Sequence, residues 1–415
     1  MKRKIFFMLI VALVFIITGG YAISALPAAV ASAAPQPAGA IQAPVLSAPK
    51  FGTVTDWESS LENIYAQVNP SVVAIEVVEG PRATSPNAPR IPGLRSGPQL
   101  QPQRALGSGF VWDTAGHIIT NNHVIDGATS ISVTFADGTT AAANVVGADP
   151  ASDLAVIQVD VPASQLHAVQ LADSTQIKVG QFAVAIGNPF GEQNTMTTGI
   201  VSALGRSLPA NGGTAQGAAY TIPDIIQTDA PINPGNSGGV LLNADGQLIG
   251  VTSAIDTASG ASAGIGFAIP SAIVQKVVPA LIQTGHYDHP YLGISGTTLN
   301  SALAQAMNFK VDQRGALVES VTPGSPADKA GLRGSTQQAT VSGVSATIGG
   351  DVITAIDGQP VKTFDDVVAY LARSTSVNQT VTLTILRDGK EQTVKVTLLA
   401  RPASTSALVT TGAPG

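Results

Sequence analysis

Short apolar runs separated by turn signals dominate the middle of the chain and predict a domain built from strands. The separating dipeptides include Asp137-Gly138, Asn188-Pro189 and Asp245-Gly246. The expected strands are 72–78, 109–112, 131–135, 154–159, 182–186, 199–204, 248–253 and 265–269. Many short strands with frequent turns are typical of an all-β barrel or sandwich.

Two segments beside these strands show helical periodicity instead. Residues 56–68 place apolar side chains at the spacing of one helical face, which predicts a helix. These side chains are Trp57, Leu61, Ile64 and Val68. A second helix is expected over 270–283, because Pro270 suits a helix start and Gly285 suits a helix stop.

Residues 290–400 show a mixed pattern, which predicts a separate α+β domain. Its strands are expected at 291–295, 316–320, 351–356, 381–387 and 393–398. Helices are expected at 326–330 and 363–373. Thr363 and Asp366, at the start of the second helix, have the spacing of a capping box.

The N-terminus combines positive charge with a long apolar run. Residues 2–4 are Lys-Arg-Lys and precede the apolar residues 5–17, which is the layout of a secretory signal. Ala31-Ser32-Ala33 offers a cleavage site that would remove residues 1–34. Without cleavage, residues 5–26 would supply the roughly 20 residues that cross a bilayer. Either outcome predicts an extracytoplasmic protein, and retention as an N-terminal membrane anchor is the favoured one.

Composition also marks segments that lie outside or interrupt the folded domains. Residues 35–54 are rich in Ala and Pro and predict an extended linker. Residues 80–106, rich in Pro, Gly and Arg, predict a long loop inside a first folded domain over 55–285. Residues 334–350 predict a polar surface insertion, and 401–415 a flexible tail.

Charge and cysteine content narrow the classes of function. Only 12% of the residues are charged and the formal net charge is −6, so nucleic-acid binding is not expected. The chain has no Cys, which excludes disulfides, thiolate metal sites and Cys nucleophiles. No nucleotide loop or metal motif is apparent in the sequence, so no cofactor is expected. Imidazole chemistry must use one of five residues: His117, His123, His167, His286 and His289.

Ser237 lies in the sharpest local motif, Asn233-Pro234-Gly235-Asn236-Ser237-Gly238-Gly239. A serine between glycines suits a nucleophile on a tight turn, where bare backbone must face the substrate. Such a turn can aim the N–H groups of Gly235 and Ser237 at one point, as a developing oxyanion requires. Taken alone, the motif fits an ordinary β-turn better, because G-x-S-G also occurs by chance.

A serine nucleophile needs a base and a carboxylate that orients the base. His123 lies at the end of a predicted strand, and Asp153 directly precedes another, so these two are the best candidates. Asp153 read alone is also compatible with a strand-start residue. His286 and His289, three residues apart, could suggest a metal, but a solvated linker fits them better.

Together these stretches resemble one known family. The order His, Asp, Ser is that of chymotrypsin-like barrels. The chain resembles the HtrA/DegP family of trypsin-like serine proteases over about residues 57–400. The matching motifs are Thr120-Asn121-Asn122-His123-Val124, Asp153-Leu154-Ala155-Val156, Gly235-Asn236-Ser237-Gly238-Gly239, Gln227-Thr228-Asp229-Ala230 and Gly266-Phe267-Ala268-Ile269-Pro270.

The resemblance implies a mostly β fold, with a chymotrypsin-like double β-barrel protease domain followed by a PDZ α+β domain. It implies His123 as general base, Asp153 as its orienting partner and Ser237 as nucleophile. The oxyanion hole would use the backbone of Gly235 and Ser237, with Asn236 between them. The long loop over 80–106 would correspond to the family's variable regulatory loop.

Substrate preference also follows from the resemblance. The residue six positions before the nucleophile forms the floor of the specificity pocket in trypsin-like enzymes, and here it is Pro231. Ile265, Gly266 and Phe267 would line the opposite wall. Because no carboxylate is present to attract Arg or Lys, cleavage is expected after small or medium aliphatic residues.

The C-terminal domain resembles a single PDZ domain. Tyr291-Leu292-Gly293-Ile294 matches the family's carboxylate-binding loop, in which backbone N–H groups hold the C-terminus of a peptide. The helix expected at 363–373 would form the other wall of the groove. Ser325-Pro326-Ala327-Asp328-Lys329-Ala330-Gly331-Leu332 supports the assignment, while the insertion at 334–350 leaves ligand preference open.

Two functions follow. The first is an ATP-independent serine endopeptidase of protein quality control and stress response, degrading misfolded proteins in the cell envelope as a homotrimer. Its partners would be unfolded substrates and C-terminal peptides. The alternative is a holdase or PDZ scaffold with a latent protease domain, although the complete set of His123, Asp153 and Ser237 argues against it.

Overall fold

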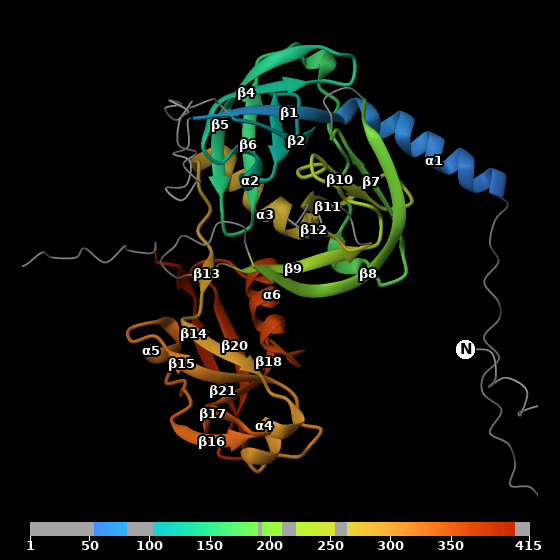
Figure 1. Ribbon diagram of the computed structural model, residues 1–415. Helices are drawn as coiled ribbons and strands as arrows, with labels where there is room; N and C mark the ends of the chain where they lie inside the picture. Colours follow the sequence, from blue (N-terminus) through green and yellow to red (C-terminus); the bar gives the residue numbers. More distant parts are fainter. Residues whose placement is uncertain (1–53, 81–102, 190–192, 210–220, 254–263, 403–415) are drawn as a thin grey trace, which may run out of the picture. The chain divides into compact units, whose positions relative to one another are not determined.

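The computed structural model describes residues 54–80, 103–189, 193–209, 221–253 and 264–402 (Figure 1). The predicted N-terminal signal, nearly all of the linker, most of the loop over 80–106 and most of the tail lie outside these residues. Within the described residues, no helix is long and apolar enough to cross a membrane.

The first six strands close into a barrel. In spatial order they are β1 Val72–Glu79, β2 Gln103–Val111, β3 His117–Thr120, β6 Leu154–Val159, β5 Thr140–Asp149 and β4 Ala128–Thr134. All neighbours are antiparallel. The β-branched runs predicted at 72–78 and 154–159 form β1 and β6, and their inward side chains fill the barrel.

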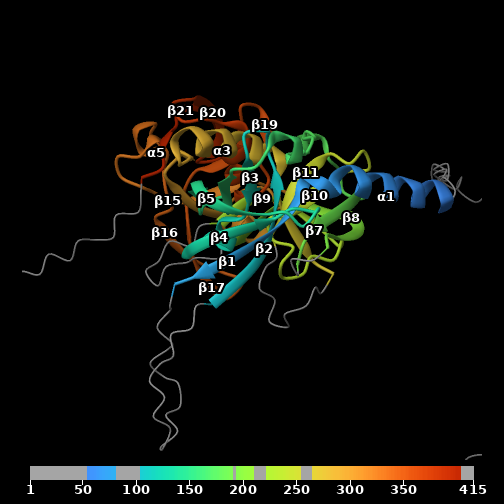
Figure 2. The same ribbon diagram turned by 90° about the horizontal axis from the view of Figure 1, so that it is seen from above.

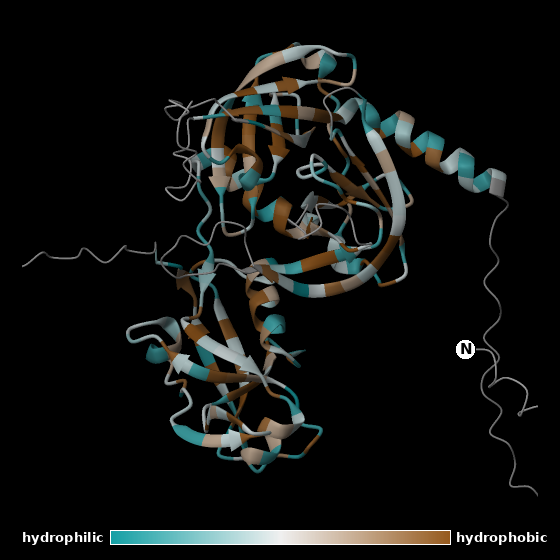
Figure 3. Cartoon of the chain, viewed as in Figure 1, coloured by the Kyte–Doolittle hydropathy of each residue, from teal (hydrophilic) through white to brown (hydrophobic). Residues whose placement is uncertain are grey.

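The next six strands close into a second barrel. In spatial order they are β10 Val240–Leu242, β11 Leu248–Ser253, β12 Gly266–Pro270, β9 Thr221–Thr228, β8 Thr195–Pro209 and β7 Phe182–Gly187. Hydrophobic residues recur along its strands (brown in Figure 3), and a cluster of them is buried. The pattern of short strands therefore resolves into two barrels rather than a sandwich.

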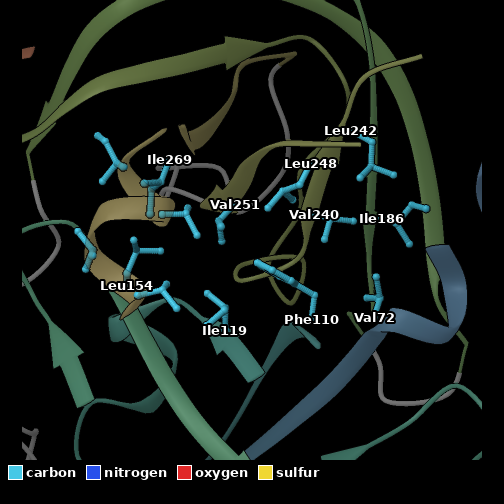
Figure 4. Close-up of a cluster of buried hydrophobic side chains, with 14 of the residues drawn as sticks. Val72, Phe110, Ile119, Leu154, Ile186, Val240, Leu242, Leu248, Val251 and Ile269 are labelled. Carbon is cyan, nitrogen blue, oxygen red and sulfur yellow. The ribbon is translucent and has the colours of Figure 1, made fainter. Parts of the chain in front are cut away.

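One buried apolar cluster is shared between the barrels (Figure 4). Phe110, Ile119 and Leu154 come from the first barrel and meet Ile186 and Val240 from the second. Since both barrels contribute to one core, the residues at their junction are held rigidly.

Helices flank the barrels. α3 Ser271–Thr284 ends at Gly285, which adopts a left-handed conformation with φ of 76°. α1 Val54–Val68 leads into β1 alongside β7 and β8 (Figures 1 and 2), and Trp57 stacks edge-on against Phe182 of β7. The remaining short helices of this part are η1 Asn69–Ser71, α2 Asn122–Ile125, η2 Ala163–Gln165 and η3 Ser174–Gln176.

The C-terminal domain is built on a twisted antiparallel sheet. Its order is β14 Ile294–Thr298, β15 Ala316–Val321, β18 Val352–Ile356, β20 Thr380–Arg387 and β21 Lys390–Thr397, with β19 Gln359–Pro360 paired to β18. The helices are α4 Ser301–Ala306, α5 Pro326–Lys329 and α6 Phe364–Ser374. Two small sheets complete it: β13 Pro290–Tyr291 with β22 Leu399–Ala400, and β16 Gln337–Val341 with β17 Val344–Ile348.

Three expectations need correction. The strand expected at 291–295 is divided into β13 and β14, because Gly293 has a φ of 85° and turns the chain between them. The end of the loop expected over 80–106 belongs to β2, where Ala105 pairs with Val77. The insertion at 334–350 contains the hairpin β16–β17. Its strands carry mostly small or polar side chains, so they do not stand out as strands in the sequence.

Candidate active site

His123 lies on α2, a single helical turn that follows β3 directly. Asn121, just before this turn, donates from Nδ2 to the backbone oxygen of Asp153 at 2.9 Å. The backbone N–H of Asn122 donates to the same oxygen at 3.1 Å. The segment that carries His123 is therefore tied to the turn that carries Asp153.

The imidazole of His123 faces the carboxylate of Asp153. His123 Nδ1 lies 2.8 Å from Oδ2 and 3.0 Å from Oδ1, and the His123 backbone N–H donates to Oδ1 at 3.0 Å. The Asp153 side chain is only 8% exposed, against 24% for His123. A carboxylate at Nδ1 holds the proton on that nitrogen and leaves Nε2 as an acceptor, the form that a general base needs.

Ser253 is a site residue that the sequence reasoning missed. Its Oγ donates to Asp153 Oδ2 at 3.2 Å, from the last position of β11. Ser253 is one hundred residues beyond Asp153, and its own sequence context is an ordinary strand end. No local spacing could have linked the two residues.

Ser237 lies on a tight turn between glycines, just before β10. Gly238 has a φ of 85°, and a Cβ there would lie 2.1 Å from the Ser108 oxygen. Gly235 has a φ of 94°, and a Cβ there would lie 2.5 Å from Pro189 Cα. Both glycines are thus required by backbone conformation and by close approach.

Hydrogen bonds from Ser108 of β2 hold this turn in place. Its backbone N–H donates to the Ser237 oxygen at 2.7 Å, and its Oγ donates to the Gly235 oxygen at 2.6 Å. Its own oxygen accepts from Thr120 Oγ1 at 2.7 Å, and Thr120 lies three residues before His123. The turn with Ser237 is therefore anchored to the strands of the first barrel that lead to His123.

The second barrel holds the other side of the same turn. The Gly238 N–H donates to the Thr252 oxygen at 2.8 Å, and Thr252 Oγ1 donates to the Asn236 oxygen at 2.5 Å. Asn236 is buried, as is Ser237. These contacts preorganise the backbone of Gly235, Asn236 and Ser237, where an oxyanion would be bound.

The residues expected to form the specificity pocket come from two segments: Pro231 lies just before the serine turn, and Ile265, Gly266 and Phe267 lie where β12 begins. Pro231 is exposed and its oxygen accepts from Thr197 Oγ1 at 2.9 Å. A Cβ on Gly266 would lie 2.7 Å from Ile232 Cδ1, so this glycine permits β12 to approach the segment after Pro231. Phe267 is partly buried, whereas Ile265 is 49% exposed. Residues 254–263 lie outside the described part.

The candidate peptide-binding loop joins β13 to β14 and contains Tyr291, Leu292, Gly293 and Ile294. The Leu292 oxygen accepts from the Ala327 N–H of α5, and the Gly293 oxygen accepts from the Thr322 N–H, both at 2.9 Å. In a trans peptide the C=O and N–H point in opposite directions. The Gly293 N–H therefore points away from α5, and the Ile294 N–H points away from Thr322.

Comparison with known proteins agrees with this geometry. Residues 107–251 match the model of the trypsin-like peptidase domain, and residues 290–398 match that of the PDZ domain. The two closed barrels, the His–Asp pair and the serine turn define the class as a chymotrypsin-like serine peptidase with one PDZ domain.

Relatives with established names narrow this class. The chain is 41% identical over 378 residues to periplasmic serine endoprotease DegP of Escherichia coli K12, covering 83% of this chain and 73% of that protein. It is 44% identical over 302 residues to a probable periplasmic serine protease do/HhoA-like of Haemophilus influenzae, covering 72% of this chain and 59% of that protein.

Solved structures give the same result. The HtrA-type protease AlgW with a tripeptide superposes with a TM-score of 0.61 at 33% identity, covering 82% of this chain and 97% of that one. AlgW with a decapeptide gives 0.58 at 33% identity, covering 82% and 99%. The chain belongs to the HtrA/DegP family of serine endoproteases, and the predicted order of double barrel and PDZ domain is confirmed.

Proposed function

We propose that the protein is an ATP-independent serine endopeptidase that degrades misfolded or damaged proteins in the cell envelope. The observation that carries this proposal is the pairing of His123 Nδ1 with the buried carboxylate of Asp153, close to an anchored serine turn. Relatives named as periplasmic serine endoproteases support an extracytoplasmic location. The membrane anchor at residues 5–26 remains part of the proposal.

In the proposed reaction, Ser237 Oγ attacks the carbonyl carbon of the scissile peptide bond while His123 Nε2 takes its proton. The oxyanion that forms accepts hydrogen bonds from the Gly235 and Ser237 N–H groups. Losing one such donor costs about 2.7–4 kcal/mol of barrier in comparable enzymes. His123 then protonates the leaving amine, and water hydrolyses the acyl-enzyme by the same steps. Asp153 stabilises the imidazolium throughout.

The pocket formed by Pro231 and β12 would select aliphatic residues such as Val, Ala or Ile before the cleaved bond. Pro231 offers no charge at the expected floor of this pocket, and the expected opposite wall, Ile265 and Phe267, is apolar. A series of peptides that differ only at this residue tests the preference. Faster cleavage after Val or Ala is expected, and a tenfold preference for Arg or Lys would refute it.

The PDZ domain would bind the C-termini of peptides. The Gly293 N–H points away from α5 and the Ile294 N–H points away from Thr322, so both can hold a carboxylate. β14, at the sheet edge, can pair with the peptide chain. Free C-termini and apolar segments are both exposed by misfolded proteins. The family resemblance further suggests a homotrimer, which light scattering of the purified protein can test.

The alternative is a holdase or scaffold whose protease domain is latent. A fluorophosphonate probe separates the two readings, because it forms a covalent bond only with an activated serine. We expect labelling of the wild-type protein at the peptide that contains Ser237 and none in Ser237→Ala. Labelling of neither form, with chaperone activity in both, would favour the scaffold.

A further inference from the structure

A second carboxylate closes the turn that carries Asp153. Asp149 is the last residue of β5, and its side chain is 6% exposed. It accepts from the Ala151 N–H at 3.2 Å and from Ser152 Oγ at 2.5 Å. These two bonds fold residues 149–152 around the Asp149 carboxylate.

This turn holds Asp153 in an unfavourable backbone conformation. Asp153 has a φ of 56°, in the left-handed region that few residues with a Cβ adopt and that Asp adopts mainly where local hydrogen bonds support it. The conformation therefore depends on the contacts around it. The register of the strands shows why this turn matters: Asp149 pairs with Leu154, so Asp153 is the last residue of the turn between β5 and β6.

The third partner of Asp149 comes from a distant part of the chain. His289 Nε2 lies 2.9 Å from Oδ1 and 2.8 Å from Oδ2. Its ring is 16% exposed and rests edge-on against Tyr287, with ring centroids 4.8 Å apart. Its backbone oxygen accepts from the Arg401 N–H at 2.9 Å. His289 is thus held firmly in the segment that links α3 to the PDZ domain.

We propose that His289, acting through Asp149, is a positioning residue for Asp153 in the proposed triad. His289 touches neither substrate nor the reacting atoms, and the inference rests on the proposed function. The Nε2 of His289 faces both oxygens of Asp149 and fixes this carboxylate, which fixes the turn of residues 149–152 and so the orientation of Asp153. The segment between the two domains thereby becomes part of the support of the catalytic centre.

The effect should fall on kcat rather than on KM. Asp153 makes three contacts with His123, two to Nδ1 and one to the backbone N–H, and a small rotation of the turn weakens all of them. Misplacement of about 1 Å by a remote change can cost up to a hundredfold in rate. The residues expected to bind substrate, Pro231 and Gly266, have no part in this network.

The test uses His289→Ala, His289→Gln and His286→Ala in the full chain, with a short peptide substrate. The Gln side chain can place an N–H donor near the position of the imidazole Nε2. His286 is the matched control, because it is exposed and its Nδ1 lies 3.1 Å from the oxygen of Thr284, the last residue of α3. Steady-state rates are measured as a function of pH, together with the thermal unfolding midpoint.

We expect His289→Ala to lower kcat between about tenfold and a hundredfold, with KM changed less than about twofold. When its contact with Asp153 is weakened, the protonated imidazole of His123 is stabilised less. The acid side of the plot of kcat/KM against pH should therefore move to lower pH. His289→Gln should recover most of both effects, and His286→Ala should match the wild type.

Unchanged kcat in His289→Ala would overturn the proposal. So would a fall in kcat with an unmoved pH profile and an equal loss in the Ala and Gln variants, which would assign His289 a purely structural role. If the wild type itself does not cleave, and Ser237→Ala behaves identically, the proposed function fails and this inference fails with it. Cleavage by the wild type together with an unaffected His289→Ala refutes the positioning role alone.

Discussion

At the scale of single residues, the space around the serine turn decides which amino acids it can contain. Gly238 combines a positive φ with an approach to Ser108 and Thr120 that leaves no room for a methyl group. The sequence motif indicated such a turn, because glycines on both sides of a serine suggest backbone that must bend and approach closely. The structure adds that Ser108 and Thr120 are the neighbours that lie against Gly238.

Replacement of Gly238 should lower peptidase activity more than a glycine replacement that only strains the backbone. In Gly238→Ala the new Cβ would displace the backbone oxygen of Ser108. The backbone N–H of the same residue holds Ser237 in place. We expect peptidase activity to fall at least about a hundredfold. Gly138→Ala is the matched control, since Gly138 has a φ of 84° with nothing within 4 Å of its Cβ position. Equal activity in the two variants would contradict this view of the turn.

Whether a site residue could be predicted from sequence depends on how far along the chain its partners lie. His123, Asp153 and Ser237 could be proposed from sequence, because each lies in a short motif at the end of a strand. Ser253 and His289 could not, because only the folding of the chain brings these distant residues to the turn that contains Asp149 and Asp153. Their identity as polar residues at strand ends carries no local signal.

At the scale of elements, helix α6 shows how local signals fix a boundary. Thr363 Oγ1 accepts from the Asp366 N–H at 3.1 Å, and Asp366 Oδ2 accepts from the Thr363 N–H at 2.8 Å. This is the capping box predicted from the spacing of the two residues.

Helix α3 likewise matches its expected span, because Pro270 and Gly285 mark both ends. The division of 291–295 escaped prediction, since its cause is the conformation of Gly293 beside Ser325.

Loss of the cap should destabilise the start of α6. Thr363→Ala removes the acceptor for the Asp366 N–H and should lower the free energy of unfolding by about 1 kcal/mol. Because α6 is the proposed wall of the peptide groove, affinity for C-terminal peptides should fall as well. Denaturant unfolding and fluorescence anisotropy with a labelled peptide measure the two effects. Thr363→Ser keeps the hydroxyl and should behave like the wild type; equal losses in both variants would contradict the capping role.

At the scale of the whole molecule, polar contacts join the barrel strands to the PDZ helix α6. Arg373 of α6 lies 3.2 Å from Asp224 of β9, and Lys276 of α3 donates to the Ala372 oxygen at 2.9 Å. Burial lowers the pKa of Lys276. Burial also raises the pKa of Asp224 to about 6, even though Arg373 opposes this change. No sequence signal indicated this pair, because its members are far apart in the chain.

Asp224 should make stability depend on pH. Its folded pKa lies above its unfolded value near 3.8, so the folded state binds the proton more tightly. The resulting stabilisation is complete below about pH 4 and is lost as the pH rises through about 6. Between pH 4 and pH 7, Asp224→Asn should therefore gain about 2 kcal/mol of unfolding free energy relative to the wild type.

Denaturant unfolding at both pH values measures this change. Asp245→Asn is the control, because Asp245 is exposed in the turn between β10 and β11. It should follow the wild type at both pH values. A pH dependence in Asp224→Asn identical to that of the wild type would show that Asp224 does not titrate in this range.

The most direct test of the proposed peptidase is casein digestion by the full chain, followed over time beside Ser237→Ala and without ATP. Circular dichroism and the unfolding midpoint should show that both forms are folded. The account predicts cleavage by the wild type and none by Ser237→Ala. Equal cleavage by both forms would remove Ser237 as the nucleophile, and no cleavage by either, even with C-terminal peptides added, would contradict the proposed function.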